Sequence, residues 1–150
     1  MNILNVSNVT ITRATINDIE PLSELLRKEN LPPDDIEKWI DYFLILKDGA
    51  TTIGGVGLEV WGKTGLFRSF VIADNYRTKG FGKELYDDIM LMAKKMNLEN
   101  VVLLAKGAVG FFEKNGFKFI TREEVSSEAK NSIQFNLKEC EIYSVMLKEI

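Results

Sequence analysis

Apolar and polar residues alternate along this chain with two periods, that of a strand and that of a helix. Val9–Ala14 alternates residue by residue, which predicts a short strand. From Ile19 to about Lys28 the apolar residues fall on one helical face. Leu31-Pro32-Pro33 ends this helix, and a second short helix is predicted from Asp34. The chain therefore begins as a strand followed by two helices.

Three apolar strands are predicted next. They are Tyr42–Leu46, Thr52–Trp61 and Leu66–Ala73. Between the first two, Asp48-Gly49 is a hairpin-turn signal. The third strand is apolar on both faces apart from Arg68 and Ser69, which is typical of a central strand covered on both sides.

The turn between the second and third strands sets an expected register. If Lys63-Thr64 is a two-residue hairpin turn, Glu59 faces Arg68 across the two strands. Opposite charges at directly facing positions attract each other. The pattern therefore predicts a cross-strand pair of opposite charge.

The second half of the chain alternates helices and strands. A glycine-rich loop, Arg77–Gly82, precedes an amphipathic helix predicted from Lys83 to about Met96. The elements expected after it are strand Val101–Leu104, helix Ala108–Lys114, strand Phe117–Thr121, a helical or irregular segment Arg122–Asn131 and strand Glu141–Leu147. This order indicates one α/β domain over residues 1–150, with a mixed sheet of about six to seven strands and about four helices.

Composition excludes several kinds of site. The 150 residues include no histidine and one cysteine, so a disulfide framework and a histidine-based triad are excluded and a zinc site is not expected. The net charge of −3 argues against a nucleic-acid partner. No apolar segment approaches the roughly 20 residues of a membrane span, and Met1–Thr10 lacks the features of a signal peptide. We therefore expect a cytoplasmic protein with neither a nucleic acid nor a membrane as partner.

The loop Arg77–Gly82 has the composition of an anion site. Helix N-termini leave backbone N–H groups free and carry a partial positive charge, which suits a phosphate or pyrophosphate. Gly80 and Gly82 permit close approach of a ligand, and the basic residues Arg77, Lys79 and Lys83 surround them. Neither the Walker loop nor the dinucleotide fingerprint matches these letters. A plain glycine-rich loop before a helix is the alternative.

Two motifs resemble one known family. Arg77-x-x-Gly80-x-Gly82, between a strand and a helix, resembles the coenzyme A signature of the GNAT superfamily of N-acetyltransferases. Phe111–Phe117, an aromatic pair followed by Glu-Lys and Gly-Phe, resembles the second hallmark of that superfamily. The resemblance implies a GNAT-like acyl-CoA N-acyltransferase fold and acetyl-CoA as co-substrate, without a metal. A looser likeness around Leu31-Pro32 and Gly54–Arg68 is to a GNAT branch associated with arsenic-resistance gene clusters.

The resemblance also implies which residues hold the two substrates. The strand residues expected along the pantetheine arm are Phe70, Val71 and Ile72. The loop residues expected at the pyrophosphate are Arg77, Thr78, Lys79, Gly80, Phe81, Gly82 and Lys83, and Phe112 lies on the helix expected along the coenzyme. The acceptor pocket is expected around Glu29–Leu31, Glu59 and Arg68.

Two positions depart from the pattern of many relatives. Phe112 stands where they carry a tyrosine that protonates the leaving thiolate, and Ala105 stands in place of an asparagine. The usual general acid is therefore absent, and water or Tyr143 is the expected proton source. Arg68 occupies a position where many relatives are acidic, which indicates an acceptor with a carboxylate or similar anion.

Glu59 is the candidate general base for the acceptor amine, acting directly or through a water. A simple ion pair with Arg68 is an equally supported interpretation, and the pair can serve both purposes. We expect direct acetyl transfer in a ternary complex to a small anionic amine, such as an amino acid or an amino-acid-like toxin. The alternatives are a coenzyme A-binding sensor without catalysis and an acetyltransferase acting on protein N-termini or lysines. A homodimer formed through a sheet edge is also expected.

Overall fold

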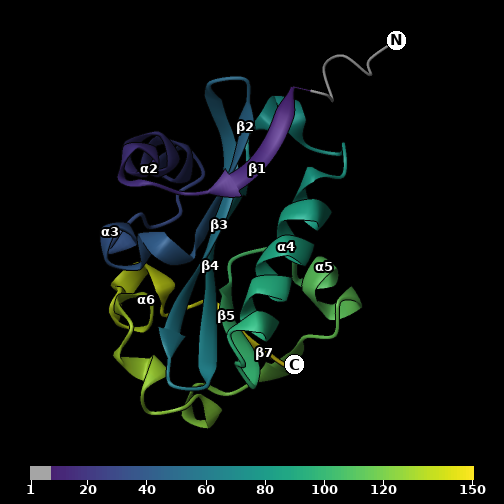
Figure 1. Cartoon of the computed structure of the whole chain (residues 1–150). Helices are drawn as coiled ribbons and strands as arrows, with labels where there is room; N and C mark the ends of the chain where they lie inside the picture. Colours follow the sequence, from purple (N-terminus) through teal and green to yellow (C-terminus); the bar gives the residue numbers. More distant parts are fainter. Residues whose placement is uncertain (1–7) are drawn as a thin grey trace. The chain divides into compact units, whose positions relative to one another are not determined.

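The computed structural model of the chain describes residues 8–150 (Figure 1). In chain order the elements are β1 (Val9–Arg13), η1 (Ile16–Asp18), α2 (Ile19–Lys28), α3 (Ile36–Trp39), η2 (Ile40–Tyr42), β2 (Phe43–Asp48), β3 (Thr51–Trp61), β4 (Thr64–Ile72), η3 (Asp74–Tyr76), α4 (Phe81–Lys95), β5 (Asn100–Ala105), α5 (Val109–Lys114), β6 (Lys118–Ile120), η4 (Arg122–Glu124), η5 (Ala129–Asn131), α6 (Ile133–Asn136), η6 (Lys138–Cys140) and β7 (Ser144–Glu149). Here η denotes a 3-10 turn.

The strands form one seven-stranded sheet with the order β1-β2-β3-β4-β5-β7-β6. The β4–β5 pair is parallel, whereas the pairs β1–β2, β2–β3, β5–β7 and β6–β7 are antiparallel. The sheet is therefore mixed, as predicted. Residues 8–150 contain five α-helices, one more than the approximate number expected.

Contacts within the chain define two compact units, and each is described by itself. The first consists of residues 8–57 together with Ser69–Met90. The second consists of Leu58–Arg68 and Leu91–Ile150. That residues 1–150 form a single domain stays a prediction.

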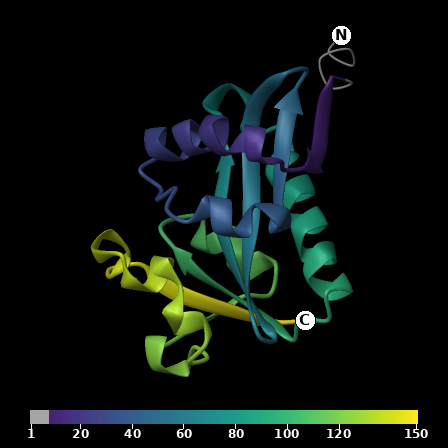
Figure 2. The ribbon, with the colours of Figure 1, turned by 60° about the vertical axis from the view of Figure 1, so that its left-hand side comes forward.

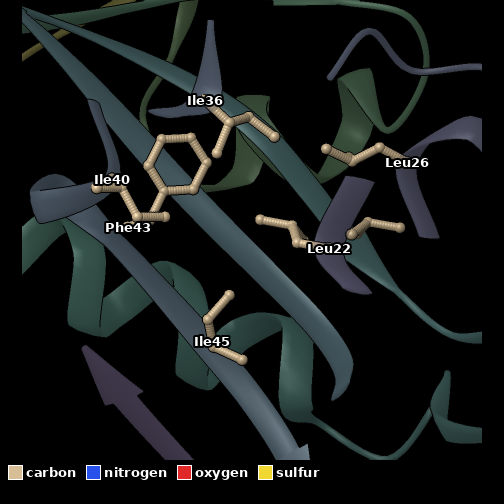
Figure 3. Close-up of a cluster of buried hydrophobic side chains, with 7 residues drawn as sticks. Leu22, Leu26, Ile36, Ile40, Phe43 and Ile45 are labelled. Atoms are coloured by element: carbon tan, nitrogen blue, oxygen red, sulfur yellow. The ribbon is translucent and has the colours of Figure 1, made fainter. Parts of the chain in front are cut away.

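The first unit has an apolar core between its helices and strands. The buried side chains of this core come from α2, α3, η2, β2 and β4: Leu22, Leu26, Ile36, Ile40, Phe43, Ile45 and Val71 (Figure 3). Phe43 lies opposite Gly57 in the β2–β3 register. A Cβ atom on Gly57 would lie 2.3 Å from the Phe43 ring, so glycine is required there for the ring to cover the strand.

The second unit has its own core and a long irregular segment. Leu66, Val102, Val125, Ala129 and Val145 form this core. The irregular segment, which contains η4, η5, α6 and η6, lies near the start of β7 in Figure 2. Arg122 Nη2 fixes its two ends, because it donates to the carbonyls of Cys140, Glu141 and Tyr143 at 2.6, 3.1 and 3.3 Å.

Several predicted boundaries differ from the observed ones, and three of these differences have a local reason. The β3–β4 turn is Gly62-Lys63, not Lys63-Thr64, and Gly62 takes the positive φ of 63° that this turn needs. Helix α4 begins at Phe81, two residues before the predicted Lys83. Strand β7 begins at Ser144, after the 3-10 turn η6, instead of at Glu141.

Among residues 8–150, no helix has the length and apolar character needed to cross a membrane.

Candidate active site

The glycine loop of the first unit lies on the surface between η3 and α4. Thr78 and Gly80 both have positive φ, 63° and 88°. Space is open around a Cβ on Gly80, so its backbone angle, and not crowding, explains the glycine. The Glu84 N–H donates to the Gly80 carbonyl at 3.2 Å as the first bond of the helix. The amides before it belong to the exposed N-terminus of a 15-residue helix, which is the geometry of an anion site.

The three basic side chains of this loop differ in their partners. Arg77 lies 3.0 Å from Glu29 and 2.6 Å from Asp74, and Lys83 lies 2.6 Å from Asp87. For Lys79, no carboxylate of residues 8–150 lies within ion-pair distance. Lys79 is therefore the loop cation whose charge is least compensated within the described chain.

Strand β4 is irregular just before the segment predicted to bind the pantetheine arm. Ser69 has a φ of 60°, the single positive φ within a strand among residues 8–150. The recorded parallel pairing with β5 ends at Phe67. A non-glycine residue with positive φ inside a strand marks a bulge-like bend, a feature that is common beside functional sites. In the sequence Ser69 stands out only as a polar residue in an apolar strand, and no sequence pattern signals this bend.

The three strand residues after Ser69 differ in how deeply their side chains are buried. Val71 is buried, whereas Phe70 and Ile72 are half-buried. A Cβ atom on Gly54 of β3 would lie 2.7 Å from the Val71 carbonyl, so the two strands approach closely here because Gly54 has no side chain. The Ala73 N–H donates to the Ile53 carbonyl at 2.8 Å and fixes the end of β4.

The second unit contains the predicted pair of opposite charges. Arg68 Nη1 donates to Glu59 Oε2 at 2.8 Å, and the two side chains are 1% and 0% exposed. Trp61 Nε1 donates to the other carboxylate oxygen, Oε1, at 2.9 Å. The ion pair is therefore confirmed, although the predicted turn was one residue too late. Trp61 is a partner of Glu59 that was not predicted, although its spacing of two from Glu59 places both side chains on one strand face.

Phe112 lies in a cluster of aromatic rings in the second unit. Its ring centroid is 5.4 Å from those of Phe67 and Phe111 and 5.6 Å from that of Phe117, each in an edge-to-face arrangement. Phe112 is buried, so the cluster has a packing role whatever else it contacts. Burial, together with Cys140 and Glu139, raises the pKa of Tyr143.

The structure thus brings the predicted site residues together in two groups. Glu29 and Arg77 form an ion pair in the first unit, and Glu59 and Arg68 form one in the second. The Glu29–Arg77 contact joins residues far apart in the sequence, and no pattern in either segment predicts it. Residues 8–150 contain no group of three or more side chains suited to hold a metal ion.

Comparison of the sequence with models of protein families shows the family of this chain. The family model of the acetyltransferase (GNAT) domain matches residues 39–119, which is more than half of the chain and includes both motifs described above. The chain belongs to the GNAT acetyltransferase family, as the resemblance indicated.

The chain is also similar in sequence to longer curated proteins. The amino-acid acetyltransferase of Buchnera aphidicola subsp. Schizaphis graminum is 27% identical over 139 residues, which cover 87% of this chain and 31% of that protein. The amino-acid acetyltransferase of Escherichia coli K12 is 29% identical over 116 residues, which cover 71% of this chain and 26% of that protein. The chain therefore spans about a third of the length of these curated relatives or less.

Solved structures share the fold. N-acetylglutamate synthase of Neisseria gonorrhoeae, complexed with coenzyme A and N-acetyl-glutamate, superposes with a TM-score of 0.80 at 17% identity. The match covers 94% of this chain and 35% of that one. This likeness shows that the described mixed sheet and helices have the GNAT fold.

Proposed function

We propose that this chain is an acetyl-CoA-dependent N-acetyltransferase whose acceptor is a small amine that also carries an anionic group, such as an amino acid. The observation that supports this function most directly is the exposed loop at the start of α4, with a positive φ at Gly80 and with Lys79 beside it. Family membership and the naming of the matched relatives as amino-acid acetyltransferases support the same activity.

The coenzyme has a defined place in this proposal. Its pyrophosphate lies on the loop residues 77–83, where amide donors and cations favour an anion. Its pantetheine arm follows Phe70–Ile72, beyond the bend at Ser69. The position of Phe112 along the coenzyme stays a prediction of the family resemblance. A structural neighbour crystallised with coenzyme A supports this choice of co-substrate. We propose no metal, because acetyl transfer to an amine needs none.

The transfer itself is a direct displacement in a ternary complex. The acceptor nitrogen attacks the thioester carbonyl carbon, an N–C bond forms and the C–S bond breaks. The proton of the amine leaves to water, and the thiolate takes a proton from water or from Tyr143. Holding the two reactants together supplies much of the acceleration, since effective molarities reach about 10⁵ M or more. Backbone amides near Ile72 polarise the carbonyl.

Glu59 acts in this proposal by holding Arg68, and not as a free base. Both of its carboxylate oxygens accept hydrogen bonds, one from Arg68 and one from Trp61. A carboxylate with both oxygens engaged and with 0% exposure is poorly placed to accept a proton from a substrate. Arg68 is 1% exposed, so the same burial argument applies to it, and its role as the partner of the anionic group of the acceptor stays a prediction.

Release of free thiol from acetyl-CoA tests the activity. The acceptor panel contains amino acids, amino-acid-like phosphinates, uncharged amines and peptides with free N-termini. We expect turnover with an amino acid and not with uncharged amines. We expect Glu59→Gln to change the KM of the acceptor more than kcat, whereas the exposed control Glu123→Gln changes neither. A large loss of kcat with loss of the acidic limb of the pH profile would instead identify Glu59 as the base. Turnover of peptides alone would move the proposal to a protein acetyltransferase.

A second candidate function is favoured by one observation. Phe112 is buried among other aromatic rings and has no hydroxyl to protonate a thiolate. A chain that binds coenzyme A tightly but transfers no acetyl group to any acceptor is a sensor or regulatory module. Binding without turnover in the panel described above would select this function. The homodimer and the cytoplasmic location stay predictions, which sedimentation and cell fractionation test.

A further inference from the structure

Arg77 is held on three sides within the first unit. Its Nε donates to the Ile72 carbonyl at 2.9 Å, its Nη1 lies 2.6 Å from Asp74 and its Nη2 lies 3.0 Å from Glu29. The guanidinium thereby links the end of β4, the turn η3 and the end of α2. The side chain is nevertheless 43% exposed, so an anion from solvent can reach it.

Glu29 is brought to Arg77 by the way α2 ends. Asn30 has a φ of 56°, the Leu31 N–H donates to the Leu26 carbonyl at 2.9 Å, and the Asn30 N–H donates to the Arg27 carbonyl at 3.1 Å. These two bonds and the left-handed residue form a Schellman motif, in which Glu29 is the C-cap. A negative charge at this end of a helix is disfavoured by the helix dipole. Arg77 therefore compensates a carboxylate that the helix itself repels.

The charges at this point oppose the binding of an anion. One guanidinium faces two carboxylates, Asp74 and Glu29, so the group carries a net negative charge. Asp74 belongs to the same short segment as Arg77 and makes the shorter contact. Glu29 comes from a distant segment, makes the longer contact and is 35% exposed, so it is the carboxylate that an incoming phosphate displaces more easily.

We propose that Arg77 exchanges its ion-pair partner Glu29 for the coenzyme when the coenzyme binds. The pyrophosphate of the coenzyme replaces Glu29 on the Nη2 side of Arg77, because a guanidinium binds phosphate oxygens in the same forked geometry as a carboxylate. Glu29 thereby sets the affinity of the loop for the coenzyme, and it is not a catalytic residue. This inference rests on the proposed function.

Calorimetric titration with desulfo-coenzyme A tests the exchange. We expect Glu29→Gln to bind it about 1.4- to fivefold more tightly than the wild type, because exposed ion pairs are worth about 0.2–1 kcal/mol. The matched control is Glu20→Gln. Glu20 lies on the same helix and pairs with Arg27 at the same 3.0 Å, away from the loop. The control is expected to bind like the wild type, and neither variant is expected to change the thermal unfolding temperature by more than a few degrees.

A double-mutant cycle separates the exchange from a general effect of charge. In an Arg77→Gln background, the additional change Glu29→Gln is expected to leave the affinity for desulfo-coenzyme A unchanged. If Glu29→Gln raised the affinity for desulfo-coenzyme A equally with and without Arg77, Glu29 would act by simple charge repulsion. That result would overturn the proposed exchange. Affinity of Glu29→Gln equal to or below that of Glu20→Gln would also overturn it, while leaving the proposed function intact. Failure of the wild type to bind desulfo-coenzyme A would reject the proposed function, and the exchange with it.

Discussion

The two arginine–glutamate pairs of this protein have the same chemistry and opposite surroundings. Arg77 and Glu29, at the loop of the first unit, lie 3.0 Å apart with side chains 43% and 35% exposed. Arg68 and Glu59, in the second unit, lie 2.8 Å apart with side chains 1% and 0% exposed. Water can replace either partner of the first pair, but neither partner of the second. The first pair is therefore suited to exchange its partner for a substrate anion, and the second to hold a fixed arrangement.

The energetic consequences differ accordingly. An exposed ion pair contributes little to stability, since both groups keep much of their hydration. A buried pair contributes little net stability either, because desolvation offsets the attraction, but removal of one partner leaves an uncompensated charge inside the protein. Substitutions that remove one partner of a pair at a time test this difference most strongly.

The largest expected effect comes from the buried pair. Arg68→Ala and Glu59→Ala are each expected to lower the free energy of unfolding by about 3–5 kcal/mol, because each leaves one buried charge without its partner. The double variant Glu59→Gln with Arg68→Met is expected to recover much of this loss. Urea unfolding followed by circular dichroism measures all three. Losses below about 1 kcal/mol in both single variants would show that water enters this site.

A smaller effect concerns the helix that carries the loop. Burial, together with Asp87, raises the pKa of Tyr86 on α4 from 10.0 to about 12. A folded-state pKa above the unfolded value means that this phenol stabilises the fold fully below pH 10, and that this stability is lost as the pH rises from 10 to 12. The loss amounts to about 2–3 kcal/mol for a shift of this size.

Unfolding in urea at a series of pH values measures this loss. Tyr86→Phe is expected to be less sensitive to pH over this range, because it has no phenol to ionise. The exposed end of the same helix offers Lys95→Gln as a control that keeps the alkaline loss of the wild type. Identical alkaline curves for Tyr86→Phe and the wild type would show that other groups determine the loss.

The smallest expected effect concerns the loop charge. Lys79→Ala is expected to weaken binding of acetyl-CoA by about fivefold at low salt, since one exposed charge contributes up to about 1 kcal/mol. The weakening is expected to shrink at high salt because exposed charges are screened. Lys83→Ala is expected to have a smaller effect, because Lys83 is paired with Asp87 at 2.6 Å. A larger loss of acetyl-CoA affinity in Lys83→Ala than in Lys79→Ala would contradict the assignment of Lys79 as the least compensated loop cation.

Much of the fold followed from local patterns. Helix α2 spans Ile19–Lys28 as predicted, because its apolar stripe and its proline-rich end are both visible in the sequence. The β3–β4 turn was placed one residue too late, since Gly62 and Gly65 flank the segment almost symmetrically and only the backbone angle of Gly62 distinguishes them. The prediction of the ion pair was correct although the turn was misplaced, because Glu59 and Arg68 lie on the same face of the hairpin with either turn.

The candidate site was predicted less completely than the fold. The loop and its cations were found because a glycine pattern before a helix is a local signal. The bend at Ser69 and the Glu29–Arg77 contact were not found. A bend inside a strand leaves no change in hydrophobic period. A contact between the end of α2 and the turn after β4 depends on packing of the whole unit, and no sequence pattern reports that packing.

Titration of the purified chain with acetyl-CoA in a calorimeter tests the central claim most directly, with ATP and NADH as matched anionic controls. We predict saturable binding of acetyl-CoA in the micromolar range and no comparable binding of either control. Binding of all three ligands with similar affinity, or of none, would contradict the claim that this loop is a coenzyme A site.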